Sequence, residues 1–224
     1  MEMLGMDVEK KSSEVVRLNV VAGKNWDEIV NFAVENNLYG IENLSGIPGT
    51  VGGATVQNIG AYGADVGDSI IEVEVFGTSD MKIKTLSAKE CLFSYRDSVF
   101  KRSEGKKYIV TKVLFELKKD GELNTSYKDV KEYFKSKNNN EITLKNLRSA
   151  ILEIRAKKFP DLNKYGTAGS FFKNPTVSRN FYEQIRERYP KIPVYEVDGK
   201  SFRISLSWVL DHICGLKGFR KWEV

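Results

Sequence analysis

Cysteine and histidine are scarce in this 224-residue chain, which contains only Cys91, Cys214 and His212. Two isolated cysteines form neither a disulfide framework nor a metal-ligand spacing. That usage is typical of a reducing compartment, and we interpret both as small core residues. His212 lies in an apolar helical stretch without a second histidine or cysteine beside it, so we interpret it as structural. The sequence therefore predicts no metal site.

Long apolar runs are also missing from the chain. No segment approaches the roughly 20 apolar residues that a membrane-spanning helix needs. The first five residues are neither basic nor followed by an apolar signal core. We therefore expect a cytoplasmic protein that does not insert into a membrane.

Charge of one sign is not concentrated anywhere. The net charge is +5 at pH 7 and the sequence pI is about 9.0, but lysines are interspersed with acidic residues, as over residues 128–135. Such mixing is typical of a solvated helix face and argues against a nucleic-acid partner. A modest positive field still favours an anionic small molecule.

Apolar periodicity predicts strands and helices that are mixed without regular βαβ alternation, which is the pattern of an α+β fold. Strands are expected over residues 15–21, 70–76, 81–86 and 108–117, with a hairpin turn at 198–199. Helices are expected over residues 26–33, 87–93, 127–137, 144–157, 181–188 and 206–214. Asn25 with Glu28, Ser87 with Glu90, and Ser178 supply the helix-start signals. A hinge is expected at residues 159–165.

Glycine is concentrated in one segment, because eight of the eighteen glycines lie within residues 40–67. Residues without a Cβ adopt positive φ and admit a ligand to the backbone, whose N–H groups can then face phosphate oxygens. Residues 44–64 are nearly free of charge, yet they keep Gln57, Asn58 and Tyr62 as hydrogen-bonding groups in an apolar wall. The segment predicts a site for a large phosphorylated ligand. A set of tight turns between packed strands is the alternative.

Two further motifs accompany the glycine segment, at residues 93–101 and 166–175. In the first, Arg96 is expected to bind an anion, and in the second, Ser170 is expected to offer a hydroxyl. The glycine before Ser170 lets a substrate approach closely, and the two phenylalanines after it exclude water. Taken alone, Arg96 would be a salt-bridged surface residue and Ser170 an ordinary strand or turn serine.

These three segments, in this order, resemble the UDP-N-acetylenolpyruvoylglucosamine reductases, also called UDP-N-acetylmuramate dehydrogenases, which are flavoenzymes of bacterial peptidoglycan synthesis. The resemblance runs from Val21 to about Gly218, and residues 95–98 and 169–174 are its most specific part. It implies an α+β fold in two parts. A partial FAD-binding domain of the PCMH/VAO type would occupy residues 1–160, and a partial α+β substrate-binding domain residues 161–224.

The resemblance also implies a reaction. NADPH as cosubstrate reduces noncovalently bound FAD, and the flavin passes hydride to the enolpyruvyl double bond of a UDP-sugar, giving UDP-N-acetylmuramate for cell wall biogenesis. Arg96 matches the arginine that stabilises the enolate-like species, and Ser170 matches the general acid that protonates the α-carbon. The matching FAD-binding residues are Ile47, Pro48, Gly49, Thr50, Val51, Gly52, Gly53, Gln57, Asn58, Gly60, Ala61, Tyr62 and Gly63. The matching substrate-binding residues are Tyr95, Tyr127, Lys158, Lys173 and Asn174.

The chain departs from the family pattern at both ends. The family begins with a further βαβ portion whose glycine loop holds part of the flavin diphosphate, and it ends beyond a catalytic glutamate that Glu223 does not match in context. We therefore expect a chain truncated at both ends, and a monomer. A noncatalytic remnant or binding module of the family, and another FAD-dependent oxidoreductase of the same fold, are the alternatives.

Overall fold

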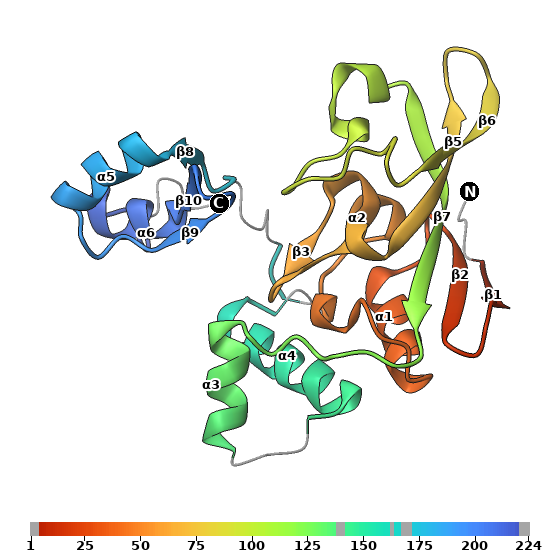
Figure 1. Cartoon of the computed structure of the whole chain (residues 1–224), viewed down its shortest axis with the longest axis horizontal. Helices are drawn as coiled ribbons and strands as arrows, with labels where there is room; N and C mark the ends of the chain where they lie inside the picture. Colours follow the sequence, from red (N-terminus) through yellow and green to blue (C-terminus); the bar gives the residue numbers. More distant parts are fainter. Residues whose placement is uncertain (1–4, 138–141, 162–163, 167–171, 220–224) are drawn as a thin grey trace. The chain divides into compact units, whose positions relative to one another are not determined.

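The structure is a computed structural model that describes residues 5–137, 142–161, 164–166 and 172–219. The chain forms two compact units, Met1–Tyr165 and Gly166–Val224. The elements of both units are labelled in Figure 1.

The first unit is built on a five-stranded sheet in which every neighbouring pair is antiparallel (Figure 1). Its strands, in spatial order, are β1 (Met6–Lys10), β2 (Val15–Val21), β7 (Tyr108–Lys118), β5 (Ile70–Gly77) and β6 (Lys82–Ser87). In β2, buried residues alternate with partly exposed ones, because successive side chains of a strand point to opposite faces. The strands expected from the sequence are therefore confirmed. Strand β1 was not expected, because its apolar alternation consists only of Met6 and Val8 among charged residues, a composition common at a sheet edge.

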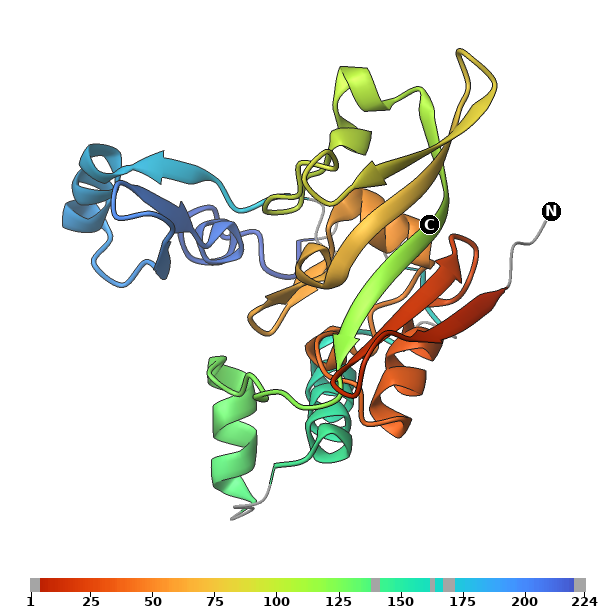
Figure 2. The ribbon, with the colours of Figure 1, turned by 45° about the vertical axis from the view of Figure 1, so that its right-hand side comes forward.

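Two helices cover the buried face of this sheet (Figures 1 and 2). Helix α1 (Trp26–Glu35) begins at Asn25, whose side chain accepts hydrogen bonds from the backbone N–H groups of Asp27 and Glu28. The buried Trp26 ring packs 5.9 Å from the ring of Phe115 on β7. The short helix α2 (Val51–Gln57) lies against β2 and β7. Through α2, the glycine segment is thus attached to the central strand β7 and to its neighbour β2.

A second layer of the first unit consists of α3 (Lys128–Ser136) and α4 (Leu144–Lys158), which pack on each other. Their apolar side chains form a separate small core, and Tyr62 belongs to it. The buried members of this core are Tyr62, Val130, Phe134, Leu147, Ala150, Ile151 and Ile154. The remaining elements are short: 3-10 helices at Glu42–Leu44, Val66–Ser69, Val99–Lys101 and Ser103–Gly105, and strands β3 (Gly60–Ala61) and β4 (Ala64–Asp65).

The second unit contains a three-stranded antiparallel sheet in the order β8 (Thr176–Ser178), β10 (Ser201–Ile204), β9 (Val194–Glu196). Helix α5 (Arg179–Arg188) follows β8 and is capped by Ser178, as expected. Helix α6 (Leu206–Trp208) continues as a π-helical turn, Val209–Ile213, and Gly215 beyond it has a φ of 64°. The turn at residues 198–199 joins β9 to β10, so the expected hairpin is confirmed.

Two expectations from the sequence were wrong. Ser87 and Glu90 do bond each other, with 2.8 Å from the Ser87 N–H to the Glu90 carboxylate, but the segment that follows forms turns rather than a helix. Leu92, with a φ of 50°, leaves the helical region there. Cys91 is buried, and burial raises the pKa of its thiol to about 12, but Cys214 is exposed rather than a core residue.

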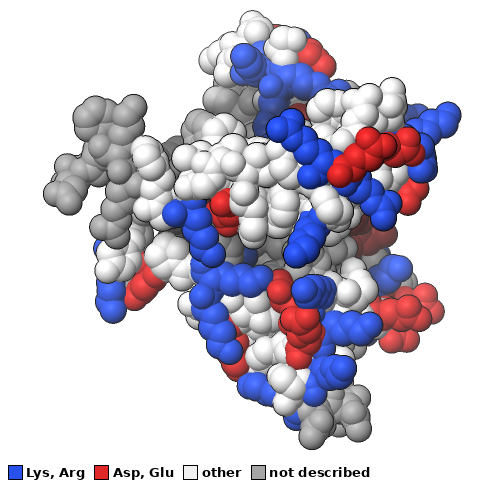
Figure 3. All heavy atoms as spheres, turned by 90° about the vertical axis from the view of Figure 1, so that its left-hand side faces the viewer, with Lys and Arg blue, Asp and Glu red and all other residues white. Residues whose placement is uncertain are grey.

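Basic side chains lie among acidic ones on the face drawn in Figure 3. Several basic side chains of the protein are paired with acidic ones, as Lys145 is with Glu35 at 2.7 Å. Across the residues that the structure describes, no helix is both long and apolar enough to cross a membrane. In the same residues, no group of three or more His, Cys, Asp or Glu side chains is placed to hold a metal ion.

Candidate functional site

Helix α2 carries the centre of the glycine segment and has two different faces. Its buried face includes Gly52, where an added Cβ would lie 2.9 Å from the Cβ of Ala22. Its exposed face is formed by Thr50, Gly53 and Gln57, whose spacing of three and four residues places them on one side of a helix. Just before the helix, Gly49 has a φ of 123°, and a Cβ there would meet nothing within 4 Å. The exposed face is therefore a surface with few side chains.

The backbone donors at the start of α2 are already used within the protein. The N–H of Val51 donates to the carbonyl of Lys24, and that of Gly52 to the carbonyl of Ala22, both at 2.9 Å. The N–H of Gly53 donates to Thr50 Oγ1 at 3.2 Å. These three groups do not face outward, contrary to the expectation that the backbone of this segment presents its donors to phosphate. Gly52 serves packing, whereas Gly49 and Gly53 leave the surface open, so the ligand site stays a prediction.

The other expected cofactor residues of the segment are divided between core and surface. Ile47 and Ala61 are partly buried against the main core, and Val51 is fully buried. Pro48 and Gly63 are exposed. The sequence grouped all of them as one loop, whereas the fold turns only some of them outward.

The β3–β4 hairpin is fixed by amide side chains from other segments. Its turn residues have positive φ, 48° at Tyr62 and 84° at Gly63. The buried Asn43 donates to the carbonyls of Tyr62 and Asn124, at 2.8 and 2.9 Å. Asn124 in turn donates to the carbonyl of Gly63 at 3.1 Å. Residues 40–46, 60–65 and 122–127 are thereby held together.

Asn58 and Gln57 connect the end of α2 to residues 94–101. Asn58 is buried, donates to the carbonyl of Ser94 at 2.7 Å and accepts from the N–H of Gly67 at 2.9 Å. Its side chain therefore joins three loops. The exposed Gln57 accepts a hydrogen bond from Lys101 Nζ at 2.7 Å.

Arg96 occupies a tight turn beside this hairpin. Ser94 and Asp97 exchange two backbone hydrogen bonds of 3.0 Å, and Arg96 between them has a φ of 53°. For a residue with a Cβ, that left-handed conformation costs about 1 to 2 kcal/mol. Persistent backbone strain of this kind concentrates at functional sites, because the surrounding structure must hold it in place.

The guanidinium of Arg96 points to the hairpin. Its Nη1 lies 3.0 Å from Oδ1 of Asp65 and 3.4 Å from the carbonyl of Asn58, and its Nη2 donates to the carbonyl of Gly60. Gly60 makes this possible, because a Cβ there would lie 2.5 Å from Arg96 Nη1 and 1.7 Å from Asp65 Oδ1. The Tyr95 ring lies 5.2 Å from the guanidinium carbon.

These bonds leave part of the guanidinium for a ligand. Arginine has five N–H donors, and the contacts within the described residues use both of those on Nη1 and one on Nη2. The Nε donor and the second Nη2 donor are not used by those contacts. Two such donors are the number that a carboxylate binds in a bidentate manner.

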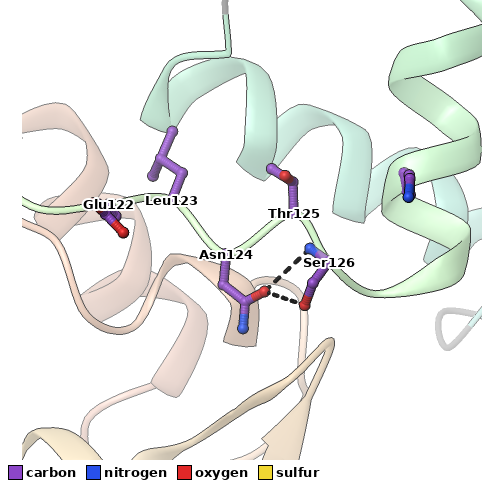
Figure 4. A pocket seen from close by; sticks show the side chains of 6 residues that line it. Glu122, Leu123, Asn124, Thr125 and Ser126 are labelled. Atoms are coloured by element: carbon purple, nitrogen blue, oxygen red, sulfur yellow. Dashed lines mark hydrogen bonds between the residues drawn. The ribbon is translucent and has the colours of Figure 1, made fainter.

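Two cavities adjoin these elements. One, of about 360 Å³, lies beside the Arg96 turn and is lined by Asn58, Asp65, Gly67, Asp68, Ala88, Lys89, Leu92, Phe93, Ser94 and Tyr95. The other, of about 480 Å³, is lined by residues 122–126 and Lys131, and Figure 4 shows their side chains. In it, Asn124 accepts hydrogen bonds from both the N–H and the hydroxyl of Ser126.

Tyr127 and Lys158 lie next to the second cavity's loop and near each other. The Tyr127 ring meets that of Tyr62 edge-on, with 5.3 Å between centroids. Burial raises the pKa of Tyr62. Lys158 Nζ lies 2.5 Å from Oδ2 of Asp129; burial alone would lower the pKa of Lys158, but the bond to Asp129 outweighs it and raises that pKa.

The expected site residues of the second unit are only partly described. Ser170 lies outside the described residues. Lys173 is exposed, and Asn174 accepts a hydrogen bond from the N–H of Leu206 at 2.9 Å, so its side chain caps α6. Their roles toward a substrate stay predictions.

A family model described as a FAD binding domain matches residues 4–87. A UDP-N-acetylenolpyruvoylglucosamine reductase from Flavobacterium johnsoniae is 36% identical over 220 residues, which are 98% of this chain and 65% of that protein. Its namesake from Bacteroides fragilis is 40% identical over 214 residues, or 96% of this chain and 63% of that protein. The chain is a homologue of these reductases. The family resemblance that the motifs predicted is confirmed.

The chain also has the fold of a solved structure. The crystal structure of UDP-N-acetylenolpyruvylglucosamine reductase from Thermus caldophilus covers 90% of this chain with a TM-score of 0.51 at 24% identity, and the match includes 68% of that chain. The predicted α+β fold with a FAD-binding domain is thus confirmed. This chain spans less than two thirds of the length of the relatives from F. johnsoniae and B. fragilis.

Sequence reasoning missed the residues that hold Arg96 and the hairpin. Asp65 pairs with Arg96, and Lys101 donates to both Arg96 and Gln57. Asn43 donates to the carbonyl of Tyr62. A signal existed for two of them, since Lys101 lies in the same motif as Arg96 and Asp65 follows the last glycine of the hairpin. No sequence spacing relates Asn43 to Asn124, 81 positions away.

Proposed function

We propose that this chain forms the FAD-binding part and some of the substrate site of a UDP-N-acetylenolpyruvoylglucosamine reductase. The reaction oxidises NADPH to NADP⁺ and reduces the enolpyruvyl double bond of a UDP-sugar to give UDP-N-acetylmuramate. The observation that carries the proposal is Arg96, an arginine held in a strained turn against Asp65 with two N–H donors left for an anion. The identity of 36 to 40% with reductases across nearly the whole chain supports it.

The exposed face of α2 fits a bound flavin. Thr50, Gly53 and Gln57, together with Gly49, offer a surface without bulky side chains, against which a flat ring system can lie. When bound, FAD supplies a carrier that takes hydride from NADPH and gives it to the substrate. Residues 47–63 contain no His or Cys that could attach the flavin covalently.

Arg96 has a defined chemical task in this reaction. Hydride adds to one carbon of the substrate double bond, and negative charge builds up beside the substrate carboxylate on the other. The positive charge of the guanidinium and its Nε and Nη2 donors stabilise that negative charge as it forms. Asp65 fixes the opposite edge of the guanidinium and so sets the direction of the remaining donors.

Further residues are proposed to act on the substrate. Ser170 donates the proton that the α-carbon receives, which requires a water-poor setting because a serine hydroxyl is a weak acid. Tyr127 and Lys158 bind the substrate diphosphate, with Asp129 holding the ammonium of Lys158 in place. Tyr95, Lys173 and Asn174 are proposed to bind other parts of the substrate.

The test separates the two half-reactions by stopped flow. The protein that carries this chain should bind FAD, release free FAD on denaturation, accept electrons from NADPH, and be reoxidised without oxygen by the enolpyruvyl UDP-sugar. In the Ser170→Ala variant, reduction by NADPH should stay nearly unchanged while reoxidation slows by at least about a hundredfold.

Three results would count against the proposal. A protein that cannot be reconstituted with FAD would be a remnant or binding module. A reduced flavin that reacts with other acceptors but not with the UDP-sugar would indicate another oxidoreductase of the same fold. Reoxidation of Ser170→Ala at the wild-type rate would assign the proton to a different residue.

A further inference from the structure

Lys101 joins the Arg96 turn to the end of α2. It is the last residue of the 3-10 helix Val99–Lys101. Its Nζ donates to the backbone carbonyl of Arg96 at 2.6 Å and to Oε1 of Gln57 at 2.7 Å. One ammonium group therefore connects the strained turn with the exposed face proposed to carry the flavin.

The carbonyl of Arg96 is one of the groups at the tip of the turn that its own backbone pairing leaves unbound. The hydrogen bonds between Ser94 and Asp97 fix the two flanks of the turn. Other side chains then hold those flanks, since Asn58 binds the Ser94 carbonyl and Arg102 binds the Asp97 carboxylate at 3.1 Å. At the tip, Lys101 donates to the Arg96 carbonyl and so resists a return of Arg96 to an ordinary conformation.

The two bonds of Lys101 differ from an ordinary surface ion pair. Both acceptors are uncharged amide oxygens, so the bonds are charge-assisted while the positive charge is not neutralised by either of them. Both are also short for N–H···O bonds. The side chain itself is exposed, so its removal leaves no cavity in the core.

We propose that Lys101 is a positioning residue. It holds the backbone of Arg96 in the left-handed conformation and in a fixed position relative to Gln57. The guanidinium is thereby kept against Asp65, with its remaining donors turned to the reacting carbons. The catalytic half of this inference rests on the function proposed above for Arg96. The structural half, that Lys101 stabilises the turn, does not.

The first measurement tests the structural half on the chain itself. Lys101→Met removes the donor from a side chain of similar length, and Lys101→Arg keeps a charged donor. The matched control is Lys106→Met. Lys106 is exposed, and its ammonium group forms no contact with the described residues. In Lys101→Met, the amides of Ser94 and Asp97 should exchange hydrogen at least about tenfold faster, without a change in the sheet amides. The other two variants should exchange like wild type. Unchanged exchange at Ser94 and Asp97 in Lys101→Met would overturn the proposal.

The second measurement uses the FAD-loaded protein. Lys101→Met should lower the limiting rate of flavin reoxidation by the enolpyruvyl UDP-sugar at least about tenfold, with little change in the substrate concentration at half-maximal rate or in reduction by NADPH. Lys101→Arg should restore the rate. Faster hydrogen exchange with unchanged flavin reoxidation would show that Lys101 only stabilises the turn, and it would rule out the positioning role. If wild type itself is not reoxidised by this substrate, the proposed function fails, whereas the exchange result still decides whether Lys101 holds the turn.

Discussion

Arg96 and Tyr62 both have positive φ values, 53° and 48°, at turn positions where glycine or asparagine is normally preferred. On backbone grounds alone, glycine would be the better residue at either position. The side chains therefore contribute something that the turn geometry does not require. For Arg96 that contribution is a guanidinium held between Asp65 and the carbonyls of Asn58 and Gly60.

Replacing Arg96 by glycine should separate stability from catalysis. We expect Arg96→Gly to change the free energy of unfolding by less than about 1 kcal/mol, because relief of strain offsets the loss of a partly exposed ion pair. Reoxidation of the flavin by the enolpyruvyl UDP-sugar should fall by at least about a hundredfold. Urea unfolding and stopped flow measure the two effects. Arg17→Gln, which removes the Arg17–Glu116 pair at 2.9 Å on the sheet, is the matched control and should leave reoxidation unchanged.

At the scale of single elements, α2 shows how two glycines in one short helix have opposite roles. A Cβ at Gly52 would meet the Cβ of Ala22 at 2.9 Å and its backbone carbonyl oxygen at 3.3 Å, and neither atom belongs to a flexible chain end. A Cβ at Gly53 would meet only Thr50 Oγ1, at the ordinary distance of 3.4 Å. Packing therefore requires Gly52, and packing does not require Gly53.

Alanine at these two positions should shift stability in opposite directions. Gly52→Ala should destabilise the protein by about 1 to 3 kcal/mol through overpacking. Gly53→Ala should be neutral or stabilise by up to about 1 kcal/mol, because alanine is the better helix former. If the exposed face of α2 carries the flavin, Gly53→Ala should nevertheless weaken FAD binding. Urea denaturation and fluorescence titration with FAD test both parts, and equal stability of the two variants would contradict the assignment of the faces.

Helices α1 and α4 are joined by a charged pair that makes stability depend on pH. Asp27 on α1 accepts from both terminal nitrogens of Arg148 on α4, at 2.7 and 2.8 Å, and from the N–H of Gly46. Burial works to raise the pKa of Asp27, but the bonds from Arg148 and Gly46 outweigh it and lower that pKa below its ordinary value. Because the folded pKa is the lower one, the contribution is complete above the unfolded pKa and is lost as pH falls through the folded value.

Asp27→Asn should therefore reduce the free energy of unfolding by about 1 kcal/mol at pH 7. The difference from wild type should shrink as the pH falls below about 4, where the carboxylate of the unfolded chain takes up a proton. Chemical denaturation at pH 7, 5 and 3 gives the comparison. A difference that stays constant over this range would show that the charge of Asp27 contributes nothing.

Most elements of the first unit were predictable because their signals are local. Strand β2 shows a two-residue alternation and α1 a side-chain cap at Asn25, and both begin where the sequence indicated. The helix predicted after Ser87 was wrong, because the same capping bonds can close a turn when the next residues leave the helical region, as Leu92 does. The pairing of Arg96 with Asp65 could not be predicted, although both lie in segments that the sequence singles out, since they are 31 positions apart and only the fold brings them together.

At the scale of the whole molecule, the two units differ in how much apolar surface they bury. Within the described residues of the second unit, the buried hydrophobic side chains are Ile192, Phe202 and Ile204, and α5 has no buried residue. The first unit contains two apolar clusters with many fully buried side chains. Stability from burial scales with apolar area, so the second unit should be the weaker one.

Hydrogen exchange on the whole chain should reveal this difference directly. Amides of β10 in the second unit should exchange at least about a hundredfold faster than those of β2 and β7, since local opening of the weaker unit costs less free energy. Mass spectrometry after proteolysis resolves the two regions. Equal protection in both units would indicate that they unfold together.

The order of strands in the sheet bears on how the chain folds as it is made. Arg17 on β2 and Glu116 on β7 bind each other although 99 residues separate them. At about 5 to 20 residues per second, the ribosome would complete β7 roughly 5 to 20 seconds after β2. During that interval β2 can pair only with β1 and its other edge stays unpaired, and the glycine segment, which is synthesised in between, lacks β7 to pack on. Such non-local pairing slows folding, so the surface around α2 takes shape only after β7 closes the sheet.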